Sequence, residues 1–212
     1  MIYISFDIGI KNLALCILRK TNKIEVLDWR IIALADSKKE LKGIDDISER
    51  VYYEMDNIVG FLKEQDINTI DYVLIENQPS NLNGVMKTIQ HIIYNYFSLI
   101  KHWDKEVENV VLVNASLKSK THNYVSEIKP EENAGNKNAK NFRRSKYLYN
   151  KKLSIDICQN YIKDNQRLLD IFANNNKKDD LSDSCLQAVS YIRTNIKNEL
   201  LNRGSESCRR PG

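Results

Sequence analysis

Four carboxylates at three places in the sequence could do metal chemistry together. Asp7 ends an apolar run in the segment Ser-Phe-Asp-Ile-Gly-Ile-Lys-Asn, and Glu76 follows four apolar residues. Asp180 and Asp183 stand three residues apart in a helical pattern, so that both can project from one side of a helix. A carboxylate at the end of a buried strand is costly unless a partner or a metal ion compensates its charge. Oxygen ligands of this kind select Mg²⁺ or Mn²⁺.

Each of the three places also has an ordinary structural explanation. Asp7 could begin a hairpin turn, and Glu76 could be a surface residue just past a strand. Asp180 could cap the last helix, because acidic residues suit a helix N-terminus. The set of four is more informative, since crowded carboxylates that hold two metal ions are suited to hydrolysis of a phosphodiester bond.

The elements that must position these residues follow from the periodicity of the apolar residues. The predicted order indicates an α/β protein with an RNase H-like fold: three strands come first, followed by a helix, a strand, a helix and a strand. Its five-stranded mixed sheet would have three antiparallel strands followed by parallel ones, flanked by helices. The predicted strands are 2–6, 13–18, 24–34, 70–75 and 110–113, and the predicted helices are 47–66, 85–101 and two that begin at Leu148 and Leu181.

The composition is that of a globular protein that folds alone. The chain has 212 residues, of which 42% are hydrophobic and 28% charged, and is too short for two ordinary domains. It has no apolar run of the ~18 residues that a membrane span needs, and its N-terminus has no secretory pattern. We therefore expect a soluble, intracellular protein. The cysteines lack zinc-site spacing and are predicted to be reduced thiols: Cys16, Cys158, Cys185 and Cys208.

A basic segment follows the last predicted strand. Residues 116–150 are poor in apolar residues and predict a long loop. The net charge of +4 alone is weak support for nucleic-acid binding. Basic residues interleaved with Phe142, Tyr147 and Tyr149 favour contact with DNA phosphates, although a solvated loop before a basic helix start remains an alternative. The candidate DNA-binding residues are Lys137, Lys140, Arg143, Arg144, Lys146, Lys151 and Lys152.

Three motifs, taken in order, resemble those of the poxvirus Holliday junction resolvases, which are relatives of bacterial RuvC. They are Asp-Ile-Gly-Ile-Lys-Asn-Leu-Ala from Asp7, Ile-Glu-Asn-Gln from Ile75, and Lys-Lys-Asp-Asp-x-x-Asp-Ser from Lys177. The frequent use of Ile, Asn, Lys and Tyr would suit an avian poxvirus member of that family. The resemblance implies an RNase H-like nuclease domain over residues 1–198, and we expect a flexible basic tail or a non-native extension over 199–212.

The resemblance also implies an activity. The chain would be a metal-dependent endodeoxyribonuclease that makes paired symmetric nicks in four-way DNA junctions, resolving concatemeric viral DNA and recombination intermediates in the cytoplasm of the infected cell. Asp7, Glu76, Asp180 and Asp183 would be catalytic residues that hold two Mg²⁺ ions per active site, with Mn²⁺ as a substitute. Other branched DNA would also bind, whereas no membrane and no small-molecule substrate is expected.

The catalytic lysine of the family is placed on Lys118, shortly after the fifth predicted strand, with Lys120 as the alternative. Either cation could stabilise charge on the scissile phosphate. A solvated loop lysine at this position is the competing interpretation.

Other functions stay open at this point. The acids would serve equally in an RNase H-like nuclease that cuts an RNA–DNA hybrid or a flap, because metal ions act on any phosphodiester. A non-catalytic junction-binding protein would not need all four acids. An actin-like ATPase, which also has an Asp-x-Gly turn, would need a second phosphate loop and a second domain that 212 residues with seven glycines do not provide.

Two symmetric nicks are most simply made by a homodimer. The helix predicted over 85–101 has apolar residues over roughly 160° of its circumference, more than one sheet face needs to cover. An outer position such as Phe97 would then contact the second subunit. The alternative is that neighbouring helices of the same chain cover the whole arc.

Overall fold

A mixed five-stranded sheet forms the centre of the molecule. The computed structural model describes residues 1–79, 84–115, 117 and 139–207, without the side chains of 139–147 and 197–207. The strand order is β3-β2-β1-β4-β5. β2 pairs antiparallel with both β1 and β3, and β4 pairs parallel with both β1 and β5, which confirms the predicted topology. The strands are β1 (Ile2–Asp7), β2 (Leu13–Lys20), β3 (Ile24–Ile32), β4 (Ile70–Glu76) and β5 (Val107–Val113).

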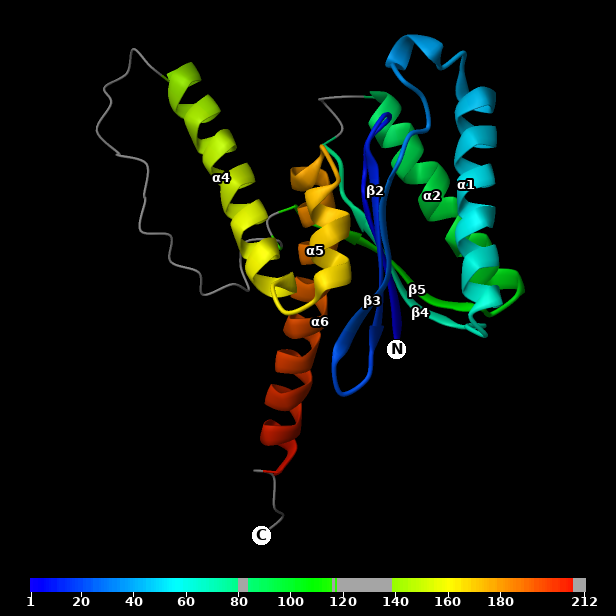
Figure 1. Cartoon of the computed structure of the whole chain (residues 1–212). Coiled ribbons are helices and arrows are strands. Elements are labelled where there is room, and N and C mark those ends of the chain that lie inside the picture. The colour runs from blue at the N-terminus through cyan, green and yellow to red at the C-terminus, as the bar shows by residue number, and fades with distance from the viewer. Residues whose placement is uncertain (80–83, 116, 118–138, 208–212) are drawn as a thin grey trace.

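Both faces of the sheet are covered, which explains why its central strands are apolar throughout. Alternate residues of β1 enter two separate cores: Ile4 and Phe6 pack on one side, and Tyr3 packs on the other. The first core lies under α1 (Ile44–Glu64) and α2 (Gly84–Trp103), with the short helix η1 (Lys38–Glu40) before them. The second lies under α4 (Ala139–Ile162), α5 (Gln166–Ala173) and α6 (Lys178–Ser207). Figure 1 shows the two helical layers on opposite sides of the sheet.

The helices of the C-terminal half differ from those predicted. α4 begins at Ala139, inside the segment 116–150 that was predicted to be a loop. Its first turns are polar, so they give no hydrophobic periodicity, although most of their residues are compatible with a helix. α5 was not predicted, since it is only eight residues long; it is capped by Asn165, whose side chain accepts a hydrogen bond from the backbone N–H of Leu168 at 3.2 Å. α6 extends to Ser207, beyond the predicted boundary at 198.

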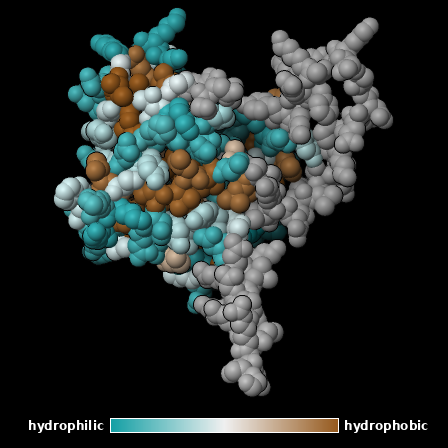
Figure 2. All heavy atoms as spheres, turned by 180° about the vertical axis from the view of Figure 1, so that it is seen from behind, coloured by the Kyte–Doolittle hydropathy of each residue, from teal (hydrophilic) through white to brown (hydrophobic). Residues whose placement is uncertain are grey.

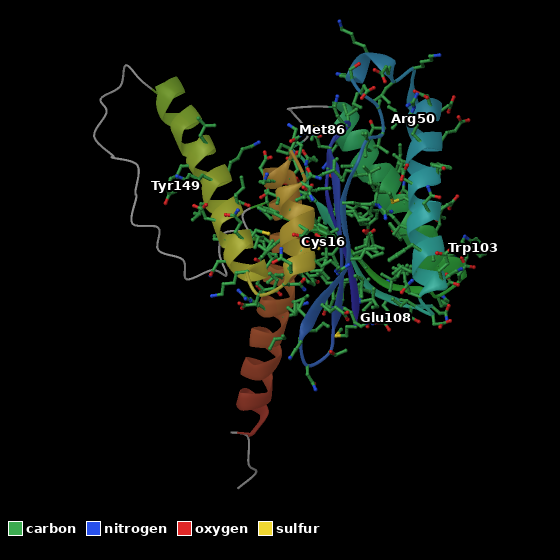
Figure 3. The ribbon with its side chains drawn as sticks, in the orientation of Figure 1. Cys16, Arg50, Met86, Trp103, Glu108 and Tyr149 are labelled. Carbon is green, nitrogen blue, oxygen red and sulfur yellow. The ribbon has the colours of Figure 1, made fainter. Side chains whose placement is uncertain are left out.

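The outer face of α2 also differs from the prediction. Phe97 has no exposed surface, and its ring lies 5.9 Å from that of Phe6 in the core, so the prediction of Phe97 as an outer residue is wrong. The hydroxyl of Tyr96 donates a 2.6 Å hydrogen bond to Asp56 of α1. α1 therefore covers much of the apolar arc, and the apolar side chains of α2 left exposed are Leu99 at 56% and Trp103 at 73%, the latter at the outer end of the helix (Figure 3).

Three of the four cysteines are core residues with free thiols, as predicted. Cys16, Cys158 and Cys185 are free and buried where β2, α4 and α6 meet, whereas Cys208 lies outside the described residues. In the described part of the chain, none of the helices is both long and apolar enough to cross a membrane.

Candidate active site

Asp7 and Glu76 lie side by side at one end of the sheet. β1 and β4 are parallel neighbours, and Phe6 is paired with Ile75, so the next residue on each strand is an acid. In parallel sheets the carboxyl ends of the strands are where ligands bind. The turn after Asp7 requires glycine, because a Cβ atom on Gly9 would come within 2.8 Å of the carbonyl carbon of Asn12.

A buried glutamine holds α6 over this end of the sheet. The side-chain amide of Gln187 donates hydrogen bonds to Ser5 Oγ at 3.1 Å and to the Phe6 carbonyl at 3.2 Å, and it lies 3.4 Å from the Leu74 carbonyl of β4. Asp183 and Asp180 are one and two helical turns before Gln187, on the same face. The anchored helix therefore presents both acids toward Asp7 and Glu76.

The beginning of α6 is fixed by β3. The indole N–H of Trp29 donates a 3.0 Å hydrogen bond to the Leu181 carbonyl, and its ring stacks on Phe172 of α5. α6 begins at Lys178, so Asp180 lies inside the first turn and is not the capping residue. The capping interpretation of Asp180 is therefore wrong. Its negative charge in the first turn still interacts favourably with the helix dipole.

The electrostatics indicate that the acids are crowded. Burial, together with the negative charges of Asp179 and Asp7, raises the pKa of Asp180 to about 6. Asp183 is held differently, since it accepts a 2.6 Å hydrogen bond from Ser154 of α4. The charge of Asp180 is thus unfavourable in the protein alone, as expected for carboxylates that share a site.

Asp179 has its own counter-charge. Burial works to raise the pKa of Asp179, but the hydrogen bond and positive charge of Lys151 outweigh it and hold the pKa below its usual range. Lys151 and Lys152 were predicted to contact DNA. In the protein alone Lys151 is paired with Asp179, and Lys152 is exposed. α4 therefore reaches the acids through both Lys151 and Ser154.

Glu76 accepts a 2.9 Å hydrogen bond from the side-chain amide of Gln78. Within the described residues, no three His, Cys, Asp or Glu side chains are close enough together to hold a metal ion. The structure brings the four predicted acids to one end of the sheet without placing them at liganding distances. Their hard oxygen donors and the repulsion at Asp180 suit a divalent cation, which would relieve that repulsion.

The predicted catalytic lysine and most of the predicted DNA contacts lie between the end of β5 and the middle of α4. Lys118, the alternative Lys120 and Lys137 lie outside the described residues. The remaining basic residues lie on the first half of α4, where the backbone is described and the side chains are not: Lys140, Arg143, Arg144 and Lys146.

The residues that orient the acids were not predicted from the sequence. Gln187 had a recognisable signal, because it is a polar residue on the buried face of the last helix at helical spacing from both acids. Ser154 and Gln78 had none, since their partners depend on how α4 and the end of β4 are placed.

The fold is shared with solved Holliday junction resolvases. The yeast mitochondrial resolvase Ydc2 superposes with a TM-score of 0.57 at 14% identity, covering 90% of this chain and 78% of that one. A fowlpox virus resolvase in complex with junction DNA gives 0.55 at 20% identity, covering 92% and 98%. Thermus thermophilus RuvC gives 0.51 at 13% identity, covering 92% and 97%. The chain therefore has a RuvC-like resolvase fold, as the motifs predicted.

The sequence comparisons are narrower. No protein-family model matches the chain. An uncharacterized protein of Acanthamoeba polyphaga mimivirus is 33% identical over 125 residues, which is 58% of this chain. The matched part spans 29% of the length of that relative.

Proposed function

We propose that this protein is a metal-dependent endonuclease that resolves four-way DNA junctions. One observation carries the proposal: Asp7 and Glu76 at adjacent strand ends face the Asp180 and Asp183 side of α6. The arrangement lies on a fold that this chain shares with three solved resolvases, and the fowlpox enzyme is described with junction DNA.

The four acids would hold two Mg²⁺ ions, with Mn²⁺ as a substitute. Bound ions of this kind supply an activated water and stabilise the leaving oxygen of a phosphodiester. Ser154 and Gln78 keep Asp183 and Glu76 oriented. Asp180 must lose its proton to bind a cation, so its raised pKa predicts weaker metal binding below about pH 6.

The basic half of α4 would bind the DNA backbone, and Lys118, or Lys120 in its place, would stabilise charge on the scissile phosphate. Lys137, Lys140, Arg143, Arg144, Lys146 and Lys152 remain candidate contacts. Lys151 is a weaker candidate, because binding a phosphate would require it to leave Asp179.

We also propose that the active form is a homodimer, because one active site cuts one strand and resolution needs two symmetric nicks. Figure 2 shows apolar side chains gathered in the middle of the back of the molecule, with hydrophilic residues around them. Leu99 and Trp103 of α2 and Leu112 of the edge strand β5 are exposed apolar residues that a second subunit could cover.

The viral assignment is part of the same proposal. The fowlpox structure and the mimivirus relative are both viral. An avian poxvirus origin, and action in the cytoplasm of an infected cell, remain predictions.

A substrate panel tests the function. The purified chain is incubated with a labelled synthetic four-way junction, a duplex, an RNA–DNA hybrid and a flap, each with and without Mg²⁺. We expect Mg²⁺-dependent nicks near the branch point of the junction and little cutting of the other substrates. Preferred cutting of the hybrid or the flap would contradict the proposal, as would junction binding without cleavage.

A further inference from the structure

A polar network behind Glu76 joins the end of β4 to the first turns of α2. Its centre is Gln90, which is fully buried. The side-chain oxygen of Gln90 accepts a 2.7 Å hydrogen bond from the backbone N–H of Gln78 and a 3.3 Å hydrogen bond from the Lys87 ammonium group. Both neighbours are donors, so the oxygen of Gln90 must face them.

The side-chain nitrogen of Gln90 is left without a hydrogen-bond partner among the described residues. A buried amide with an unpaired donor destabilises the folded protein, because that donor has lost its hydrogen bond to water. An apolar residue would avoid that cost, but it could not accept the two hydrogen bonds. A glutamine at this buried position is therefore better explained by its hydrogen bonds to Gln78 and Lys87 than by a contribution to core stability.

Lys87 closes the network around the residues that follow Glu76. Its Nζ lies 2.9 Å from the Gln78 carbonyl oxygen and 3.0 Å from Asn77 Oδ1. The N–H of Asn77 in turn donates to the Val113 carbonyl of β5 at 2.8 Å. The backbone of Asn77 and Gln78 is thus fixed from two sides, by α2 and by the neighbouring strand. Figure 3 locates the first turns of α2, where Met86 is labelled.

The network ends on the candidate active site. With the Gln78 backbone fixed, its side-chain amide donates to Glu76 Oε2 at 2.9 Å and sets the orientation of the carboxylate. Among the described residues the three acceptors of Lys87 are uncharged oxygens, so its ammonium group fixes the residues that follow Glu76 and does not pair with a carboxylate there. Partners one step removed from a metal ligand commonly set metal affinity in this way.

We propose that Lys87 is a positioning residue for the metal site: with Gln90 and Gln78 it orients Glu76 and so sets the affinity for the divalent ion. The inference rests on the proposed function, because it concerns the same site. Lys87 itself need not touch metal or DNA.

Two measurements on the full chain test it, with Lys87→Met, Lys87→Ala and the conservative Lys87→Arg. The matched control is Lys101→Met, because Lys101 lies on the same helix and also donates to a backbone carbonyl, that of Glu108, far from Glu76. In metal-free protein, hydrogen exchange at the backbone N–H of Gln78 should speed up in Lys87→Met and Lys87→Ala and stay unchanged in Lys101→Met. Mn²⁺ binding, followed through the electron paramagnetic resonance signal of the free ion, should weaken by about 10-fold in the first two variants and recover in part with arginine.

The outcomes separate the inference from the function it rests on. If the wild-type chain binds Mn²⁺ and cuts junctions while Lys87→Met and Lys87→Ala bind Mn²⁺ as tightly as wild type, the positioning role is overturned and the nuclease proposal stands. A wild-type chain that binds no Mn²⁺ would overturn both. If Mn²⁺ binding is weakened as much in Lys101→Met as in Lys87→Met, the inference is also overturned, since the effect would then reflect a general change of charge.

Discussion

At the scale of single residues, neighbouring acids in this protein have opposite properties. The pKa of Asp179 lies below its usual range because Lys151 offsets its burial, whereas the pKa of Asp180 is raised to about 6 by burial and by the charges of Asp179 and Asp7. The residue type and the position in the chain are nearly the same. The difference arises because the Asp179 side chain meets α4 and the Asp180 side chain faces the sheet end where Asp7 lies.

The raised pKa of Asp180 predicts a specific dependence of stability on pH. The folded state keeps a proton on Asp180 up to about pH 6, whereas the usual value is 3.8. The free energy of unfolding therefore falls as pH rises from about 4 to 6, and the loss is fully present above pH 6. Discounted for solvent screening, the loss is about 1 kcal/mol, so Asp180→Asn should raise the melting temperature at pH 7 by about 2–4 °C without metal.

The difference between Asp180→Asn and wild type should vanish near pH 4, which thermal unfolding in chelator can measure. Asp45→Asn is the matched control, because Asp45 is an exposed acid in the first turn of α1. The negative charge of Asp45 should slightly stabilise that helix, so Asp45→Asn should lower the melting temperature slightly or leave it unchanged. A lower melting temperature for Asp180→Asn at pH 7 would mean that the helix-terminus effect outweighs the repulsion.

At the scale of elements, the order and direction of the strands could be predicted from the sequence, because β1, β2 and β4 are buried on both faces and therefore apolar. The ends of β1 and β4 could be predicted for the same reason, and with them the positions of Asp7 and Glu76. The beginning of α4 could not be predicted, since its first turns have no apolar stripe. The contacts of α4 with Asp179 and Asp183 could not be predicted either, because they depend on tertiary packing.

The basic half of α4 has a prediction of its own. Arg143→Ala, Arg144→Ala and Lys146→Ala together should weaken junction binding and reduce the slope of log affinity against log salt by about 1–3, since fewer counterions are released. Fluorescence anisotropy over a series of KCl concentrations, in chelator, gives that slope.

The control is the triple variant Arg19→Ala, Lys20→Ala and Lys23→Ala. These three substitutions remove the same positive charge as the α4 variant. They do so at the end of the sheet opposite the acids, where Arg19 pairs with Ile2 at the start of β1. A slope reduced equally by both triple variants would show that the α4 segment is not a specific contact.

At the scale of the whole molecule, the width of an apolar arc does not reveal which neighbour covers it. The arc on α2 was wide enough for a second subunit, yet α1 covers Tyr96 and the core takes Phe97. What remains for a partner is smaller and lies toward the end of the helix, at Leu99 and Trp103.

The homodimer proposal is therefore tested at Leu99. Leu99→Asp should shift a micromolar sample from dimer to monomer in sedimentation velocity, because a carboxylate cannot be buried there without a partner. Leu148→Asp serves as the control, since Leu148 is equally exposed, at 56%, but lies on α4. A wild-type monomer that still makes paired nicks would remove the argument for a dimer.

If the acids at the sheet end cut four-way junctions, the protein should cut a plasmid that carries an extruded cruciform. With Mg²⁺, wild-type protein should convert the supercoiled plasmid to linear product, the result of two nicks placed symmetrically across the junction. Asp7→Asn should reduce the rate by about 100-fold or more, since a ligand matters at least as much as its outer partners, while it still binds the junction through basic contacts. If Asp7→Asn forms linear product at the wild-type rate, Asp7 is not a metal ligand of the active site. If the wild-type protein leaves the cruciform uncut, the protein is not a junction resolvase.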